Sequence, residues 1–344
     1  MCSRLFTAFV LYLTCHAEPT QQKRKIERSL QWNPSDSHLR LLSEDLSDMD
    51  HFKSSVLRPL LVERVSGTDG NKGVQNHIKS LLTSWQLEED TFVDSTPYGE
   101  KTFTNIIATL NPLKQQKIVL ACHFDSKYFP EGTFLGATDS AVPCGILLQT
   151  AMLLQCFLEK SPVGDVTLQL IFFDGEEAFM DWTATDSLYG AQHLADRWAS
   201  EFDPVFSNMT RLDVIREFIL LDLIGTSDTS IPQQFDSTAE LYRLLVNTEI
   251  RLRASGFLTG NHSGPIFSGD VSDDGIQDDY LPFLRRGVDI VHLISAPFPS
   301  VWHAFTDDWE HLDFAMIDDF SRVFRVFVSS LMQLKLDNTS CHRE

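Results

Sequence analysis

Apolar segments of strand length alternate with segments of helical spacing along most of this 344-residue chain. The strand-like segments are residues 117–124, 166–174, 218–223 and 288–294. The helix-like segments that follow them are residues 142–158, 187–198, 238–255 and 315–336. Continuous apolar strands that alternate with helices are typical of a parallel sheet with helices on both faces. We therefore predict an α/β fold around a central, mostly parallel β-sheet.

The region before these segments adds a hairpin to the predicted sheet. Strands are expected at residues 92–93 and 103–110, on either side of the turn residues Pro97-Tyr98-Gly99. Helical spacing over residues 73–86 predicts a helix just before the hairpin. With this hairpin the predicted sheet is mixed rather than purely parallel.

The interior of the chain shows no domain boundary. No internal repeat, proline-rich linker or charge block divides residues 41–340, so we predict one globular domain over that range. Residues 18–40 are polar and are expected to form a poorly packed arm that precedes the domain.

Residues 1–17 have the pattern of a secretory signal peptide. Arg4 precedes an apolar stretch over residues 5–13, and small residues lie near Ala17. The alternatives are a membrane anchor, a buried strand and a mitochondrial transit peptide. The apolar stretch is too short for an anchor, and the Arg- and Ser-rich character of a transit peptide is missing. We expect a secreted protein, with Golgi-retained and mitochondrial forms as alternatives, and no later stretch able to span a bilayer.

The glycosylation signals and the cysteines are compatible with export. The glycosylation candidates are Asn208, Asn261 and Asn338. The cysteines that remain after signal cleavage are Cys122, Cys144, Cys156 and Cys341. An oxidising compartment permits disulfides, and both a Cys122–Cys144 bridge and two buried thiols fit the residues.

The chain is strongly acidic, with a formal net charge of −20. A surface of that charge repels nucleic acid and anionic lipid and favours cationic partners. We therefore expect no nucleic-acid partner and no stable membrane insertion after signal cleavage.

Acidic or histidine side chains follow the apolar segments at five places. They are His123 with Asp125, Asp139, Glu176 with Glu177, Asp222, and His303. Open α/β sheets bind ligands at the carboxyl ends of their strands. Carboxylate and imidazole groups together suit zinc best among the common metal ions. The series therefore predicts a metal site at one edge of the sheet.

The adjacent residues Glu176 and Glu177 can divide two roles between them. In a turn, neighbouring side chains point in different directions, so one carboxylate can bind a metal while the other acts as a base. The alternative is a solvated acidic loop, which the apolar Phe172 and Phe173 just before the turn disfavour.

Three other residues have more than one interpretation. Asp139 fits a metal ligand and a helix N-cap equally well, because it lies in a small-residue loop before a helical segment. His303 follows Pro297 and Pro299, which disfavour regular structure, and is interpreted as a ligand on a rigid loop. His292 lies inside an apolar strand and is interpreted as structural or as a support for the site.

These motifs resemble a known family. The order His-x-Asp, Asp, Glu-Glu, Asp, His is that of the zinc aminopeptidase superfamily, whose members bind two zinc ions. The longer strings are closer to one branch, the animal glutaminyl cyclases, and the resemblance runs from about residue 42 to residue 336. The strings that carry it are residues 121–129, 137–144, 172–179, 221–225, 276–279, 282–288 and 297–303.

The resemblance implies a role for each site residue. It implies the zinc aminopeptidase-like fold and a single zinc ion held by Asp139, Glu177 and His303, with Glu176 as the acid and base. The other implied residues are the carboxylates Asp222 and Asp278, the substrate-binding residues Trp182, Gln277, Phe298 and Trp302, and a Cys122–Cys144 disulfide. Cys156 and Cys341 are then expected as free thiols.

The resemblance also implies a reaction, the cyclisation of N-terminal glutamine in peptides to pyroglutamate with release of ammonia. The implied partners are peptides that begin with Gln or Glu, and a monomer is expected. One alternative is a metallo-aminopeptidase with two zinc ions, because His123 and Asp222 match second-zinc positions in that superfamily. The other is a non-catalytic ectodomain, which typically loses ligands, whereas none is missing here.

Overall fold

The computed structural model describes residues 32–160, 164–260, 262, 264–272, 275–336 and 341. From Asn33 onward the chain forms one compact unit. The predicted signal peptide and the glycosylation candidates Asn261 and Asn338 lie outside the described residues.

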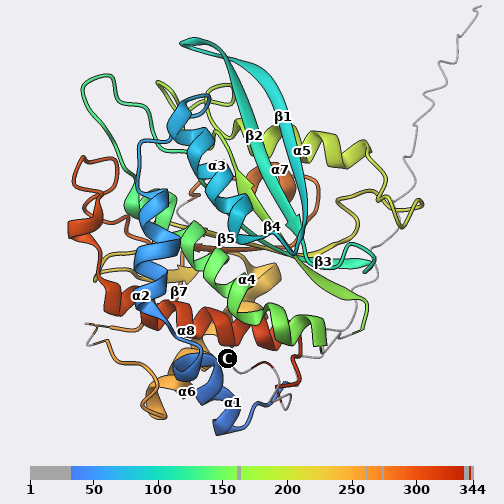
Figure 1. Ribbon diagram of the computed structural model, residues 1–344, viewed down its shortest axis with the longest axis vertical. Helices are drawn as coiled ribbons and strands as arrows, with labels where there is room; N and C mark the ends of the chain where they lie inside the picture. The colour runs from blue at the N-terminus through green and yellow to red at the C-terminus, as the bar shows by residue number, and fades with distance from the viewer. Residues whose placement is uncertain are drawn as a thin grey trace, which may run out of the picture. The chain divides into compact units, whose positions relative to one another are not determined.

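A six-stranded sheet lies at the centre of this unit, with the strand order β1-β2-β4-β3-β5-β8 (Figure 1). The strands are β1 (Gln86–Thr96), β2 (Gly99–Thr109), β3 (Gln116–His123), β4 (Val166–Phe173), β5 (Ile215–Asp222) and β8 (Ile290–Ile294). Strands β4, β3, β5 and β8 are parallel to one another, whereas β1 pairs with β2, and β2 with β4, in antiparallel fashion. The prediction of a mixed, mostly parallel sheet is confirmed.

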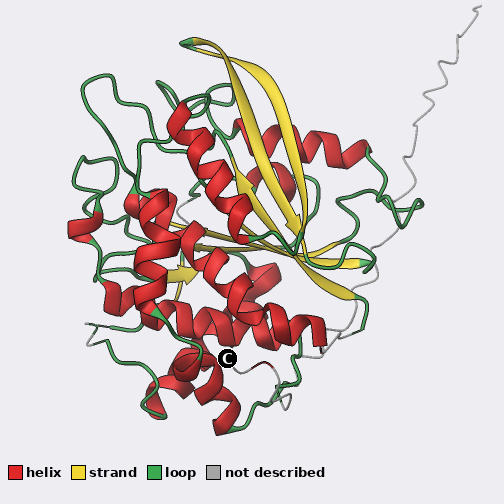
Figure 2. Cartoon of the chain, in the orientation of Figure 1, coloured by secondary structure: helices red, strands yellow, loops and turns green. Residues whose placement is uncertain are grey.

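Helices cover both faces of the sheet (Figure 2). The longer ones are α3 (Asp69–Leu81), α4 (Val142–Lys160), α5 (Tyr189–Ser200), α6 (Ala239–Ala254) and α8 (Phe314–Leu331). Val119 and Ala121 of β3 belong to a buried apolar cluster that also contains residues of α5 and of the short α7 (Leu281–Leu284). Because side chains alternate along a strand, Ile118 and Leu120 point to the opposite face, and α4 packs against β3 and β5. Burial on both faces explains why these strands are continuously apolar.

The core helix α4 corrects one expectation. We expected no stretch beyond the N-terminus to be long and apolar enough to span a bilayer. The helical segment Ala137–Lys160, which contains α4, has that length and apolar composition. Its most apolar window is 78% buried inside the fold. Contacts with β3, β5 and α8 account for the apolar sequence, as in the core helix of a globular domain.

The region before the hairpin differs from the prediction. Helix α3 ends at Leu81, earlier than expected, and β1 begins at Gln86. Helical turns that we did not predict lie at α1 (Asp36–Arg40), η1 (Leu41–Asp45), α2 (Met49–His51), η2 (Phe52–Leu57) and η3 (Arg58–Leu60). Leu39 of α1 is buried, so packed structure begins within the range assigned to the polar arm. A small two-stranded sheet of β6 (Ile231–Gln233) and β7 (Phe267–Val271) was also missed.

Two disulfide bonds link the part of the chain that the structure describes. The predicted Cys122–Cys144 bridge is confirmed, with a Cα–Cα distance of 5.6 Å, and it joins the end of β3 to the start of α4. The expectation that Cys156 and Cys341 are free thiols is wrong, because these residues form a second disulfide across a sequence separation of 185. Only the tertiary fold brings Cys341 to the end of α4, so the sequence spacing could not reveal this pair.

The second bridge predicts the result of a thiol titration. A chain that lacks residues 1–17 keeps four cysteines, all of them paired in this fold. Titration of the unfolded, non-reduced chain should therefore find no free thiol, and reduction should release all four. Two free thiols before reduction would contradict the Cys156–Cys341 bridge.

Candidate active site

The sheet brings the predicted site residues to one edge. His123 ends β3 and Asp222 ends β5, and the segment Asp174 to Glu177 follows β4 directly. These strands are parallel, so their carboxyl ends lie at the same edge, and His123 pairs in register with Phe173 of β4. The expected crowding of polar side chains at the strand ends is therefore realised.

Asp139, Glu177 and His303 form the first polar cluster. One possible ligand atom from each lies within 4.8 Å of the others. His303 Nε2 lies 3.4 Å from Asp139 Oδ2 and 3.4 Å from Glu177 Oε1, although neither oxygen has a hydrogen-bond partner. Buried carboxylate oxygens without partners are costly, and their convergence on one imidazole fits a bound cation.

The second carboxylate oxygen of Asp139 and that of Glu177 each lie close to a nitrogen of another side chain. Asp139 Oδ1 lies 3.1 Å from His123 Nε2, and Glu177 Oε2 lies 3.3 Å from Lys127 Nζ. Each carboxylate is thus anchored through one oxygen and presents the other to the cluster, an arrangement that orients metal ligands in many proteins.

The electrostatics of this cluster are coupled. Burial lowers the pKa of His303, but the attraction of the Asp139 and Glu177 carboxylates outweighs it and raises the pKa to about 9. Burial raises the pKa of Asp139, but the attraction of His123 and His303 outweighs it and holds that pKa below its usual value. The cluster therefore combines anionic oxygens with a strongly polarised imidazole.

A second cluster shares Asp139 with the first. It contains His123, Asp139 and Asp222, and His123 Nε2 lies 3.4 Å from Asp222 Oδ1. Ser140 Oγ donates a hydrogen bond to Asp222 Oδ1. Asp139 therefore bridges two groups that could each hold a cation.

A tight turn separates the roles of Glu176 and Glu177. Gly175 has a φ of +78°, and a β-carbon there would lie 2.5 Å from the Phe103 ring, so only glycine fits. The backbone N–H groups of Glu176 and Glu177 each donate to the Asp125 carboxylate at 3.2 Å. Asp125 thus holds the turn, while only Glu177 contributes a ligand atom to the described clusters.

Glu176 has the properties of a proton-transfer group. Its side chain is buried, and burial together with repulsion from Glu177, Asp278 and Asp279 raises its pKa well above the usual value, against an opposing effect of His123. A buried carboxyl group with a raised pKa beside a possible metal site is a typical candidate for an acid and base.

Asp278 and His292 belong to the same buried network. His292 Nε2 lies 2.7 Å from Asp278 Oδ2, and the backbone N–H of Asp279 donates to Asp278 Oδ1 at 2.6 Å. Burial and repulsion from Asp278 raise the pKa of Asp222 to about 6, against a hydrogen bond with His123 that lowers it. Of the two interpretations of His292, its contact with Asp278 favours support for the site. A lone histidine in an apolar strand was the only sequence signal.

The four predicted substrate-binding residues form two contacting pairs, one joined by a hydrogen bond and one aromatic. Trp182 Nε1 donates to Gln277 Oε1 at 3.3 Å. The rings of Phe298 and Trp302 are 4.8 Å apart, and the Trp302 ring stacks on His303 at 4.0 Å. Trp182 and Trp302 are each 41% exposed, so both indoles are available to a ligand at the surface.

Sequence reasoning missed two basic residues at this site. Lys127 contacts Glu177 as described above and also donates to Ala178 O at 3.0 Å. Arg64 is fully buried behind the loop that carries Asp139 and donates to Asp139 O at 3.3 Å. Arg64 lies outside every motif, and Lys127 lies within residues 121–129 but was given no role, because the partners of both residues lie far away in the sequence.

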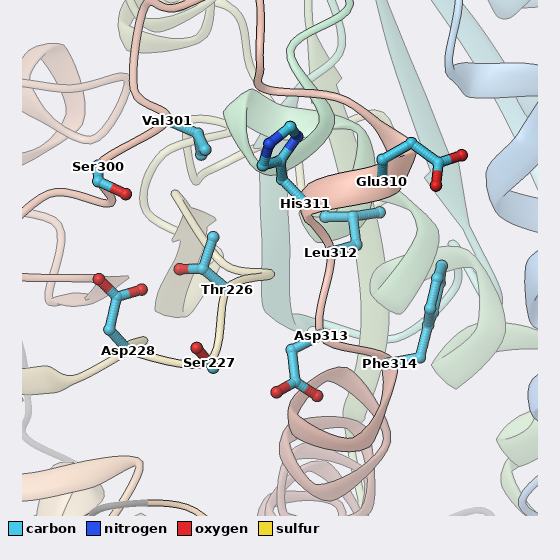
Figure 3. A pocket seen from close by; sticks show the side chains of 10 residues that line it. All are labelled: Thr226, Ser227, Asp228, Ser300, Val301, Glu310, His311, Leu312, Asp313 and Phe314. Atoms are coloured by element: carbon cyan, nitrogen blue, oxygen red, sulfur yellow. The ribbon is translucent and has the colours of Figure 1, made fainter.

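The described residues also form a pocket of about 480 Å³, which Figure 3 shows. It is lined by Thr226, Ser227, Asp228, Ser300, Val301, Glu310, His311, Leu312, Asp313 and Phe314. Val301 directly precedes Trp302, and Thr226 follows Asp222 by four residues. None of the predicted site residues lines this cavity, so we assign it no part in the chemistry.

Comparisons with known proteins identify relatives of this chain. Residues 105–328 match peptidase family M28. The chain is 45% identical over 295 residues to the glutaminyl-peptide cyclotransferase of Gloydius blomhoffii, covering 81% of this chain and 80% of that protein. It is 44% identical over 312 residues to the glutaminyl-peptide cyclotransferase of Bos taurus, covering 87% and 86%.

Solved structures show the same similarity. The crystal structure of Macrostomum lignano glutaminyl cyclase superposes with a TM-score of 0.83 at 38% identity, covering 89% of this chain and 96% of that one. A Zn-dependent exopeptidase from Parabacteroides distasonis superposes with a TM-score of 0.65 at 21% identity, covering 81% and 97%. This second similarity shows a shared fold.

Proposed function

Because this chain belongs to the glutaminyl-peptide cyclotransferase family, and to peptidase family M28, we propose that it cyclises N-terminal glutamine in peptides and proteins to pyroglutamate, with release of ammonia. The observation that carries the proposal is the buried Glu176, whose pKa is raised, beside the Asp139–Glu177–His303 cluster. The exposed indole of Trp302, which stacks on His303 of this cluster, supports it.

The proposed cofactor is one zinc ion per chain, held by Asp139, Glu177 and His303. Two buried, unpartnered carboxylate oxygens and one imidazole are a donor set that zinc prefers, and three protein ligands are typical of catalytic zinc. When bound, zinc would polarise the side-chain carbonyl of the substrate glutamine and stabilise negative charge on its oxygen.

The chemistry left to the protein is proton transfer and positioning. The substrate α-amine attacks its own side-chain carbonyl carbon, a C–N bond closes the five-membered ring, and the C–N bond to the amide nitrogen breaks to release ammonia. Glu176 accepts a proton from the attacking amine and donates one to the leaving nitrogen. Since both reacting groups belong to one residue, the pocket accelerates the reaction by holding them close.

The surroundings of Glu176 suit this role. Burial and repulsion from Glu177 and Asp278 raise the pKa of Glu176, which favours its role as a proton donor to the leaving nitrogen. Trp302 and Phe298 cover the side of the cluster next to His303, which helps to exclude water and so disfavours hydrolysis.

The second candidate function is a metallo-aminopeptidase. The His123–Asp139–Asp222 cluster favours it, because it offers a second cation position that shares Asp139 with the first. Such an enzyme would use two metal ions and water to release amino acids from peptide N-termini.

One experiment separates the two functions. We expect the zinc-loaded protein, incubated with a Gln-initiated peptide, to release ammonia and leave a peptide lighter by one NH₃, with one zinc per chain by elemental analysis. A peptide blocked at its α-amine by acetylation is the matched control and should not react. Release of free amino acids by protein with two zinc ions per chain would contradict the proposal.

The cellular setting follows from the N-terminus. We propose that residues 1–17 direct export and are removed, and that the mature protein is a secreted monomer. The substrates would be peptides that begin with Gln or Glu. The net charge of −20 favours peptides with basic residues further along.

A further inference from the structure

Arg64 is a fully buried arginine that none of the roles above uses. Its relative exposure is 0%, and its pKa is lowered by burial to about 10, against the attraction of nearby carboxylates, so it stays protonated at neutral pH. Its guanidinium donates to main-chain carbonyl oxygens, which are those of Phe124 at 2.5 Å, Val62 at 3.3 Å, Leu135, Gly136 at 2.9 Å and Asp139 at 3.3 Å.

These bonds use the whole donor capacity of arginine, which has five N–H groups in a fixed plane. Four of the five acceptors lie on one loop, which begins at Phe124 after β3 and ends at Asp139. Arg64 therefore ties together the start of this loop, its turn at Leu135 and Gly136, and the main chain of Asp139.

The loop needs such a clamp because its backbone is crowded. Gly136 has a φ of +51°, and a β-carbon there would lie 2.1 Å from Asp139 O. The Arg64 guanidinium donates to Gly136 O and Asp139 O, so one planar group fixes two main-chain carbonyls of this tightly turned segment.

We propose that Arg64 is a positioning residue that holds Asp139, the last residue of this loop, in its ligand geometry before zinc binds. The inference rests on the proposed function, since it concerns the zinc ligand Asp139. Groups that orient a ligand from behind typically contribute about 10–100-fold to metal affinity.

The test is the variant Arg64→Lys. Lysine keeps the positive charge, so long-range electrostatics toward zinc are little changed, but it has three donors on one atom and cannot span the five carbonyls. We expect the zinc dissociation constant, measured by competition with a chelator of known affinity, to rise by about 10–100-fold. Activity at saturating zinc should recover most of the wild-type kcat.

The matched control is Arg325→Lys. Arg325 of α8 is also fully buried and donates to a main-chain carbonyl, that of Leu42, away from the site. Both apo variants are compared by thermal unfolding, because each is expected to lose stability. The Arg325 variant should bind zinc as the wild type does, despite its lower stability.

The outcomes are distinct. Unchanged zinc affinity in the Arg64 variant would overturn the inference, and so would an equal loss of affinity in both variants, which would indicate general destabilisation. Cyclase activity with normal zinc binding in Arg64→Lys would refute the positioning role and leave the proposed function intact. A wild-type protein that binds no zinc would overturn both.

A milder variant covers the case in which Arg64→Lys does not fold. The backbone N–H of Arg64 donates to Ser126 Oγ at 3.0 Å, so Ser126→Ala loosens the clamp without changing the guanidinium. We expect a smaller loss of zinc affinity in the folded Ser126→Ala protein. An affinity equal to that of the wild type would count against the inference.

Discussion

Glu176→Gln should lower kcat by about 10²–10⁴-fold while the protein keeps its zinc, the usual contribution of a positioned acid and base. Glutamine preserves the size and the hydrogen-bonding reach of the side chain but cannot accept the amine proton. The measurements are steady-state kinetics on a Gln-initiated peptide and elemental analysis of the same sample. Loss of zinc along with activity would show that Glu176 acts as a ligand.

The pH profile provides a second check on the same residue. Burial and repulsion from Glu177 and Asp278 raise the pKa of Glu176, and only the deprotonated carboxylate can accept the amine proton. The wild-type rate should therefore fall as the pH drops through this raised pKa. The residual rate of Glu176→Gln should lack that acidic limb, and an unchanged limb would assign it to another group.

Glu177→Gln is the matched control, because the two residues are adjacent and the substitution is the same. It replaces an anionic ligand with a neutral one, so zinc affinity should fall first and activity only as a consequence. Added zinc should then partly restore Glu177→Gln and leave Glu176→Gln unchanged. Rescue of the Glu176 variant instead would reverse the two roles.

His303→Ala should remove zinc and activity together. The loss of zinc affinity should exceed the roughly 100-fold that is typical when a residue that only orients a metal ligand is removed. His303 is the only nitrogen donor in the Asp139–Glu177–His303 cluster, and without it two buried carboxylates face each other. Asp139→Ala is expected to behave in the same way. Zinc content and kcat/KM of the purified variants are the measurements.

The control for this loss is His311→Ala. His311 lies on the wall of the pocket shown in Figure 3 and is an exposed partner of Asp308, outside both clusters. This variant should keep zinc and activity. Full zinc occupancy in His303→Ala would show that the first cluster is wrongly assigned.

The strands that carry the site were predictable because a strand that is buried on both faces has a continuously apolar sequence. β3, β4 and β5 are continuously apolar, and the polar residues that follow them stand out against that background. The helical turns over residues 36–60 have no comparable sequence pattern. Each turn is too short for its apolar residues to show a helical period. The same holds for the short strands β6 and β7.

Residues without a neighbouring signal escaped prediction at the site as well. Four of the carbonyl groups that accept from Arg64 lie 60 to 75 residues away, and a main-chain acceptor leaves no trace in the sequence. For His292 the sequence left two interpretations open, because its partner Asp278 lies outside its own strand. Cys156 and Cys341 meet only because the end of the chain returns to α4.

The sequence by itself determined the kinds of element and the kinds of side chain at their ends, because periodicity and composition are properties of neighbouring residues. Only the tertiary structure decided that oxygens of Asp139 and Glu177 converge unpartnered on His303, since their separation depends on how distant loops pack. The raised pKa of Glu176 likewise arises from burial and from surrounding carboxylates that the fold gathers from several loops.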